Sequence, residues 1–170
     1  MTNWKENKKW SDKFLTHIKQ ILGLYLIGEP NKEEDQERNT DLIVLKMEAV
    51  RIACRVRRNS YLLKYGDEIT IRCSLPSENK TELTKIVEGW GDYIFYGFSN
   101  EEENDLSAWI LGDLKVFRLW FNRQIVKNKG LLPGKQKHNI DNSSNFLVFN
   151  INKFPENFTI AREYDKSKVS

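Results

Sequence analysis

Charged and apolar side chains alternate along RIACRVRR, residues 51–58, and this alternation restricts the segment to an extended strand with two unlike faces. One face carries the apolar positions Ile52, Cys54 and Val56, and the other carries Arg51, Ala53, Arg55 and Arg57. A buried charge without a partner is strongly unfavourable, so the arginine face must meet acidic side chains, solvent or phosphate. The fold therefore has to accommodate one strand whose charged face needs a partner.

Two other segments also have the pattern of strands. DLIVLK, residues 41–46, is a nearly continuous apolar run that begins at Asp41, as is typical of a buried strand. In EITIRC, residues 68–73, the alternation places Ile69, Ile71 and Cys73 on one face and Glu68, Thr70 and Arg72 on the other. We expect these two strands and residues 51–58 to form one sheet.

Apolar residues at helical spacing predict three helices. The first begins at a Ser11 cap and runs to Tyr25, the second covers residues 81–90, and the third begins at an Asp113 cap and ends near Asn128. Further strands are expected at residues 91–98, 108–112 and 145–151, with an edge segment at 154–160 and a basic loop at 129–145.

These elements predict a mixed α/β protein. We expect its 170 residues to form a single domain, with a core at about 11–128 and a C-terminal strand extension at about 129–165. The aromatic stretches GWGDYIFYGF and VFRLWF could stack on nucleobases, but their spacing fits packing in the core better.

The charged residues are unevenly distributed along the chain. The net charge is only +3, yet residues 29–41 are mainly acidic, and residues 114–137 contain seven Lys and Arg residues and no acid. This asymmetry indicates either a surface that faces phosphate or a set of solvated faces.

The two cysteines, Cys54 and Cys73, form no disulfide framework, and we expect both to be buried thiols in a reducing compartment. No segment has the roughly 18 apolar residues of a membrane helix, and the N-terminus has no apolar signal core. The sequence therefore predicts a cytoplasmic protein without a membrane partner.

The order helix, three strands, helix, strand over residues 11–98 resembles the core of the PD-(D/E)XK nuclease superfamily, which includes restriction endonucleases and archaeal Holliday-junction resolvases. Asp41 matches the aspartate that opens the second core strand of this family. The resemblance implies a restriction-endonuclease-like αβββαβ core with a C-terminal helix and strand extension. It also implies metal-dependent hydrolysis of DNA, in which two carboxylates hold Mg²⁺ or Mn²⁺ against the scissile phosphate.

The sequence departs from the family at the E-x-K tripeptide, whose place is taken by Arg55, Val56 and Arg57. Arginine cannot ligate a cation, so a metal site would need another carboxylate beside Asp41. Glu68 is the best candidate, and Glu34, Asp35 and Glu37 are further ones. As alternatives, Asp41 is a turn or capping residue and Glu68 faces solvent.

Two functions follow. The first is a metal-dependent DNA endonuclease with catalytic residues Asp41, Glu68, Arg55 and Arg57, of which Asp41 and Glu68 hold the metal. The second is a non-catalytic relative without a cofactor, which binds DNA or a protein and could form a homodimer. In both, nucleic acid would contact Arg51, Arg55, Arg57, Arg58 and Arg72. A competing explanation pairs these arginines with Glu68 and with the acidic loop around Glu34.

Overall fold

The computed structural model describes residues 4–28, 43–44, 50–74, 80–139 and 144–164. The chain divides into two compact units, residues 2–49 and residues 50–170, and each is described by itself. Asp41, which the sequence places in a buried strand, lies outside the described residues.

The smaller unit contains two helices and a short antiparallel pair of strands. Helix α1 (Trp4–Asp12) and helix α2 (Leu15–Leu26) replace the single helix expected from Ser11 to Tyr25. Ser11 lies inside α1, where its hydroxyl donates to the carbonyl of Lys8, so the prediction that it caps a helix is wrong. Strands β1 (Ile27–Gly28) and β2 (Ile43–Val44) pair antiparallel.

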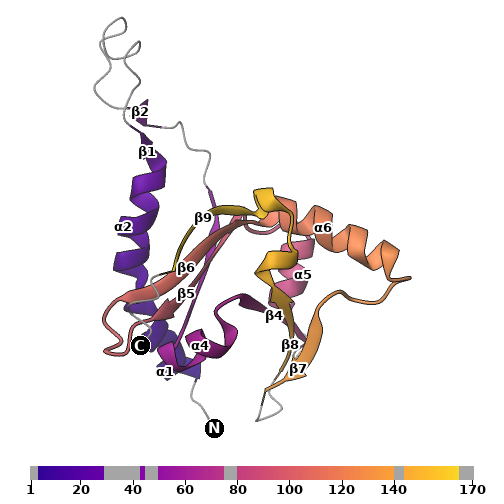
Figure 1. Cartoon of the computed structure of the whole chain (residues 1–170), viewed down its shortest axis with the longest axis horizontal. Coiled ribbons are helices and arrows are strands. Elements are labelled where there is room, and N and C mark those ends of the chain that lie inside the picture. Colours follow the sequence, from indigo (N-terminus) through magenta and orange to yellow (C-terminus); the bar gives the residue numbers. More distant parts are fainter. Residues whose placement is uncertain (1–3, 29–42, 45–49, 75–79, 140–143, 165–170) are drawn as a thin grey trace, which may run out of the picture. The chain divides into compact units, whose positions relative to one another are not determined.

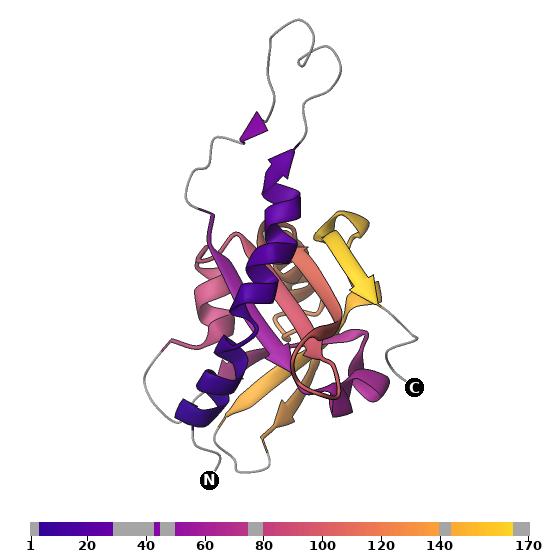
Figure 2. The ribbon, with the colours of Figure 1, turned by 90° about the vertical axis from the view of Figure 1, so that its left-hand side faces the viewer.

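The larger unit contains a mixed four-stranded sheet (Figures 1 and 2). Its strands, in spatial order, are β3 (Ile52–Arg57), β5 (Tyr93–Ser99), β6 (Leu106–Asp113) and β9 (Thr159–Tyr164). Strand β3 is parallel to β5, and the other two pairs are antiparallel. Strand β5 is buried from Ile94 to Ser99, as is usual for a strand covered on both faces.

A second, antiparallel sheet has the order β4 (Glu68–Ser74), β8 (Asn145–Asn150) and β7 (Lys135–His138). The expected single sheet of residues 41–46, 51–58 and 68–73 is therefore wrong, because β3 and β4 belong to different sheets. Strand β4 pairs with β8, so that Ile69 and Ile71 lie beside Phe149 and Leu147 on the buried face. Strand β7 lies inside the segment that was expected to be a loop.

Two helices of the larger unit match their predictions in position. Helix α5 (Glu82–Val87) begins at Thr81, whose side chain accepts from the Thr84 main-chain N, and it ends before the exposed Trp90. Helix α6 (Leu114–Lys127) begins at Asp113, whose carboxylate accepts from the main-chain N atoms of Lys115 and Val116 at 2.6 and 3.1 Å. The predicted Asp113 cap is confirmed.

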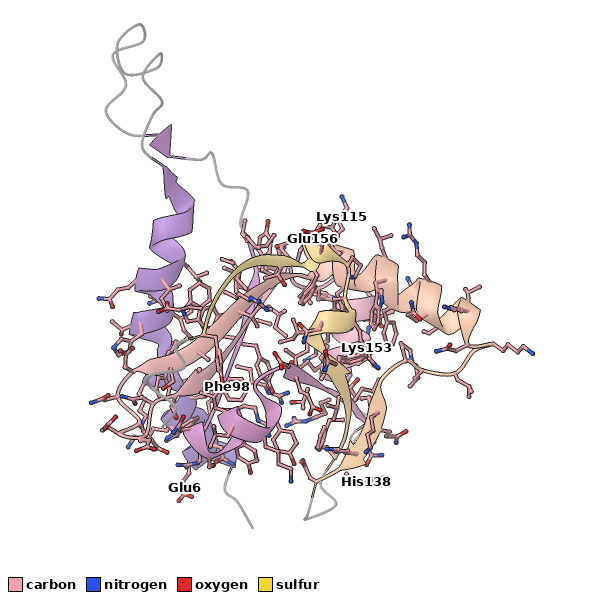
Figure 3. All side chains as sticks on the ribbon, viewed as in Figure 1. Glu6, Phe98, Lys115, His138, Lys153 and Glu156 are labelled. Carbon is pink, nitrogen blue, oxygen red and sulfur yellow. The ribbon has the colours of Figure 1, made fainter. Side chains whose placement is uncertain are left out.

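The main core lies between the two sheets and these helices. Helices α5 and α6 lie on the same side of the four-stranded sheet as β4 and β8 (Figure 1). Phe117 of α6 is fully buried and forms an edge-to-face contact with Phe149 of β8, with ring centroids 5.5 Å apart. Phe98 lies among these interior side chains, whereas Lys115 and His138 lie at the periphery (Figure 3).

Short helical segments complete the larger unit. The 3-10 helix η1 (Asn59–Tyr61) and helix α4 (Leu62–Tyr65) connect β3 to β4, and the 3-10 helices η2 (Ile151–Lys153) and η3 (Glu156–Phe158) connect β8 to β9. The expected edge segment at 154–160 is confirmed in part, because β9 is the outer strand of the described sheet. None of the described helices is long and apolar enough to cross a membrane.

Candidate functional site

Arginine side chains project from β3 toward the second sheet. The parallel register places Arg55 beside Tyr96 and Arg57 beside Phe98, so all four side chains leave the same face of the four-stranded sheet. This is the face that contacts the main core, and β3 lies at its outer edge. The alternation predicted for residues 51–57 is therefore confirmed, and it directs two arginines to the junction of the two sheets.

Arg55 connects the two sheets through hydrogen bonds. Its Nη1 atom donates to the carbonyl oxygen of Thr70 on β4 at 2.5 Å and to the hydroxyl of Thr70 at 3.2 Å. The hydroxyl of Tyr96 on β5 lies 3.0 Å from the same Thr70 hydroxyl. Arg55, Thr70 and Tyr96 therefore form one polar network within a largely apolar junction.

Glu82, at the start of α5, supplies the negative charge of this network. Its Oε2 atom lies 3.5 Å from Arg55 Nη1 and accepts a hydrogen bond from the Arg72 main-chain N at 3.1 Å. The acid that contacts Arg55 is thus Glu82 rather than Glu68, and Glu34 lies outside the described residues. Arg55 is held internally, as in the competing explanation from the sequence, but its acidic partner is Glu82 and not the predicted Glu68.

A cavity of about 200 Å³ opens beside this network, and we call it the arginine pocket. Among the described residues its lining has no carboxylate, and it consists of Arg55, Arg57, Thr70, Arg72, Asn139, Ser144 and Phe146. Asn139 and Ser144 are joined by a side-chain hydrogen bond of 2.7 Å. Because a water molecule takes up about 30 Å³ in the liquid, the pocket has room for a small anion with some of its hydration.

Arg57 and Arg72 have a different environment from Arg55. Neither forms an ion pair with another described residue. The guanidinium carbon of Arg57 lies 4.2 Å from the centroid of the Tyr61 ring, at a distance typical of a cation–π contact. Within the described part of the chain, no carboxylate therefore neutralises the charge of either arginine.

The surface beside the arginine pocket is also basic on the second sheet, as the pairing of its strands shows. Arg72 of β4, Phe146 of β8 and Lys137 of β7 are directly opposite one another, so their side chains share one face. The next row on that face places Lys135 of β7 beside Val148. The surface next to the arginine pocket thus carries two further cations.

Arg51 and Arg58 do not line the arginine pocket. Arg51 is exposed just before β3, where its main-chain N donates to the Asp92 carboxylate at 2.7 Å. Arg58 is exposed and pairs with Glu103. The structure therefore brings together Arg55, Arg57 and Arg72 out of the five arginines proposed from the sequence.

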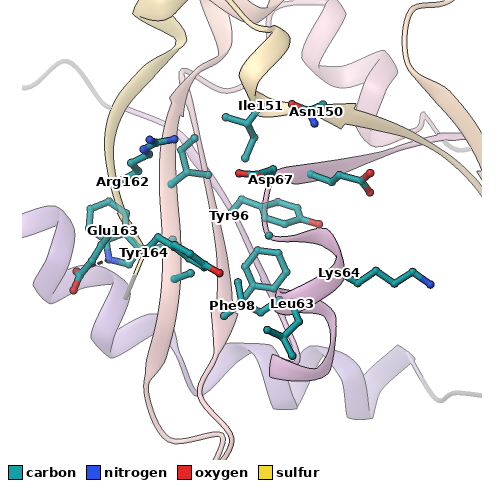
Figure 4. A pocket seen from close by; sticks show the side chains of 16 residues that line it. Leu63, Lys64, Asp67, Tyr96, Phe98, Asn150, Ile151, Arg162, Glu163 and Tyr164 are labelled. Atoms are coloured by element: carbon teal, nitrogen blue, oxygen red, sulfur yellow. Dashed lines mark hydrogen bonds between the residues drawn. The ribbon is translucent and has the colours of Figure 1, made fainter. Parts of the chain in front are cut away.

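Glu68 lies at the other end of β4 from Arg72. Four residues of extended strand place the backbones of these two residues about 13 Å apart. It lines a separate cavity of about 700 Å³ together with Asp67, Arg162 and Tyr164 (Figure 4). Tyr96 also lines this larger cavity, while its hydroxyl contacts Thr70 of the arginine pocket. Tyr96 therefore links the lining of the larger cavity to Thr70 of the arginine pocket.

The described donor atoms do not fit a divalent cation. Within residues 4–28, 43–44, 50–74, 80–139 and 144–164, no group of three His, Cys, Asp or Glu side chains could hold a metal. Arginine offers no lone pair to a metal, and the arginine pocket contains three of them. The predicted pair Asp41 and Glu68 stays a prediction, because Asp41 lies outside these residues.

The cysteines are less buried than expected. Cys54 is exposed and Cys73 is partly exposed, so the prediction of two buried thiols is wrong. Desolvation by neighbouring atoms nevertheless raises the pKa of both thiols. Exposure governs the access of a reagent to Cys54, whereas the raised pKa keeps its sulfur protonated at neutral pH and hence a weak nucleophile.

Sequence reasoning missed four pocket residues, namely Thr70, Asn139, Ser144 and Phe146. Thr70 and Phe146 were assigned correctly to strands, but no sequence pattern joins these strands to β3. No family model matches the chain, and neither a curated protein nor a solved structure matches it. The geometry of the described residues therefore supplies the functional argument.

Proposed function

We propose that this protein binds DNA through the phosphate backbone, with the arginine pocket as the central phosphate site. One observation carries the proposal: three arginines line a small open cavity, and no carboxylate is among its lining residues in the described part of the chain. Like charges that converge in this way repel one another, and a bound anion removes the repulsion. Guanidinium groups also present paired donors that match phosphate oxygens.

The surroundings of the pocket support a polymeric anion rather than a single small one. Lys135 and Lys137 extend the positive surface over β7, next to the pocket residue Phe146. Contacts of this kind fix the protein on the nucleic-acid backbone without reading the bases. We therefore expect binding that depends strongly on salt and weakly on base sequence.

The order of elements supports a nuclease-like arrangement for this binding protein. The chain runs α2, β1, β2, β3, then α4 and β4, then α5 and β5, with β3 parallel to β5. If α4 and β4 are treated as an insertion, the remaining order along the chain is that of the αβββαβ core, although β1 and β2 pair in a two-stranded sheet of their own. The place of E-x-K then falls on Arg55 and Arg57, which is why we favour the non-catalytic, DNA-binding form of this fold.

The test is the double substitution Arg57→Ala with Arg72→Ala. We expect it to weaken duplex DNA binding and to lower the slope of log K against log salt by about 2, since each phosphate contact contributes about 0.9. The loss should be similar for unrelated DNA sequences. Fluorescence anisotropy titrations at several salt concentrations measure both quantities.

A matched control removes two exposed cations elsewhere, Lys115 and Lys153. The Lys115→Ala, Lys153→Ala variant has the same net charge as the test variant and should keep a nearly unchanged salt slope. An equal loss in both variants would show a general charge effect instead of a phosphate site. A wild-type protein that fails to bind DNA at low salt would overturn the proposal and favour the protein-binding alternative.

A metal-dependent nuclease is the second candidate, and the same order of elements favours it. Asp41 would anchor the metal together with Glu68, and Glu34, Asp35 and Glu37 outside the described part of the chain are further candidates. In that case Asp41→Asn abolishes cleavage of DNA in Mg²⁺ or Mn²⁺ and leaves the thermal midpoint nearly unchanged. Cleavage by the Asp41→Asn variant at the wild-type rate would exclude this role for Asp41. The absence of cleavage by the wild type with either ion would exclude it as well.

A further inference from the structure

We infer that the preferred ligand is single-stranded nucleic acid, with an unpaired base stacked on Tyr61 beside the arginine pocket. This inference rests on the proposed phosphate site, which it extends to a second, aromatic subsite. The two subsites are adjacent because Arg57 belongs to both the arginine pocket and the contact with Tyr61. It lines the pocket, and its guanidinium lies 4.2 Å from the Tyr61 ring centroid.

Tyr61 is among the exposed aromatic residues of the described part of the chain, together with Trp90 and Tyr164. It is 42% exposed, whereas the aromatic residues of the core are 9% exposed or less. The guanidinium group of Arg57 lies over the ring, which stays partly open to solvent at the start of the α4 segment. One residue, Arg58, separates η1 from β3, and α4 follows η1 directly, so Tyr61 lies only four residues after Arg57 of the phosphate site.

Tyr65 adds a second aromatic ring to this surface. Its ring centroid lies 6.2 Å from that of Tyr61. Three cations surround the ring of Tyr65, because Lys137, Lys64 and Arg57 lie 5.1, 5.4 and 5.7 Å from its centroid. These cations come from three different elements, β7, α4 and β3, so the tyrosine pair lies within a basic surface instead of at its margin.

An exposed tyrosine next to a phosphate site discriminates between forms of nucleic acid. In a duplex both faces of each base are covered by neighbouring bases, so a protein ring cannot stack without unstacking them. In a single strand the base faces are free. Proteins that bind single strands combine a basic surface for the backbone with aromatic rings for the bases, and each stacked base contributes substantially to affinity.

The experiment compares binding of an oligo-dT strand with binding of a duplex of equal length, for the wild type and for Tyr61→Leu. We expect the wild type to bind the single strand more tightly. Tyr61→Leu should weaken single-strand binding by about 5-fold to 150-fold, the range expected for one stacked base, and leave duplex binding within about 2-fold. Tyr61→Phe should retain single-strand affinity, since the ring is kept.

Leu63→Ala provides the matched control, because Leu63 is 78% exposed on the adjoining helix α4 and its truncation should affect neither ligand. Wild-type protein that binds duplex at least as tightly as oligo-dT would overturn the inference and leave the proposed function standing. The absence of binding to either ligand would overturn both. Unchanged single-strand affinity in Tyr61→Leu would remove the stacking role of Tyr61.

A measurement on the wild type avoids any effect of substitution on folding. Photocrosslinking with a strand that contains 4-thiothymidine attaches the base to the residue that it contacts. We expect crosslinks at Tyr61 or elsewhere within residues 57–65. Crosslinks found only outside that segment would overturn the inference.

Discussion

Replacing Phe117 by alanine lowers the free energy of unfolding by about 3–5 kcal/mol. Phe117 has no exposed surface and lies at the centre of an aromatic cluster. Its ring centroid is within 6.0 Å of those of four other residues, namely Trp120, Phe121, Phe149 and Phe154. Truncation leaves a cavity between α6 and β8 that rigid neighbouring rings cannot fill. Urea denaturation followed by circular dichroism measures the loss.

Leu119→Ala on the same helix is the control for this substitution. Leu119 is 54% exposed, so its truncation removes little buried area and should change the free energy of unfolding by at most about 0.5 kcal/mol. Similar losses in the two variants would show that α6 does not pack as described. A loss below about 1 kcal/mol for Phe117→Ala would contradict the central position of this ring, given the usual range for phenylalanine truncation.

Arg55→Ala lowers the free energy of unfolding by about 1–3 kcal/mol, because polar partners lose a charged donor in a partly buried place. The affected groups are the carbonyl and hydroxyl of Thr70 and the carboxylate of Glu82. The side chains of Arg55 and Glu82 are 29% and 27% exposed, so solvent replaces only part of what is lost. Thermal and urea denaturation measure the change.

Arg51→Ala is the matched control for Arg55→Ala. Arg51 belongs to the same alternating set but is exposed, and we expect its removal to change stability by at most about 0.5 kcal/mol. The comparison separates a structural arginine from a surface arginine that has the same sequence pattern. Equal stability of both variants would mean that the network of Arg55, Thr70 and Glu82 contributes nothing to the fold.

Local patterns in the sequence predicted individual elements well. The alternation around Ile69 and Ile71 identified β4 and its buried face, and Asp113 marked the start of α6. These features depend on residues that are close in sequence. The pairing of strands does not, because the partner of β4 is β8, more than 70 residues further along the chain. Strand β7 was missed because its sequence KQKH has no apolar residue to signal a strand.

In the candidate site too, features set by nearby residues were predictable and features set by tertiary packing were not. Period-two alternation correctly placed Arg55 and Arg57 on one face, and Arg72 was assigned to its strand face in the same way. The different environments of these arginines were not predictable, because Glu82 and Tyr61 reach them through tertiary packing and a short helix. Burial of Cys54 was overestimated for a related reason, since alternation identifies a face but not how completely the face is covered.

Strand β7 has a consequence for the behaviour of the protein at high concentration. In the described part of the chain it is the outer strand of its sheet, with backbone groups on one side that no strand partner uses. Such an edge invites strand addition by a second molecule, and lysine side chains oppose it because two copies would repel each other. Lys135 and Lys137 therefore discourage self-association along β7, and a polyanion that neutralises them would remove that protection.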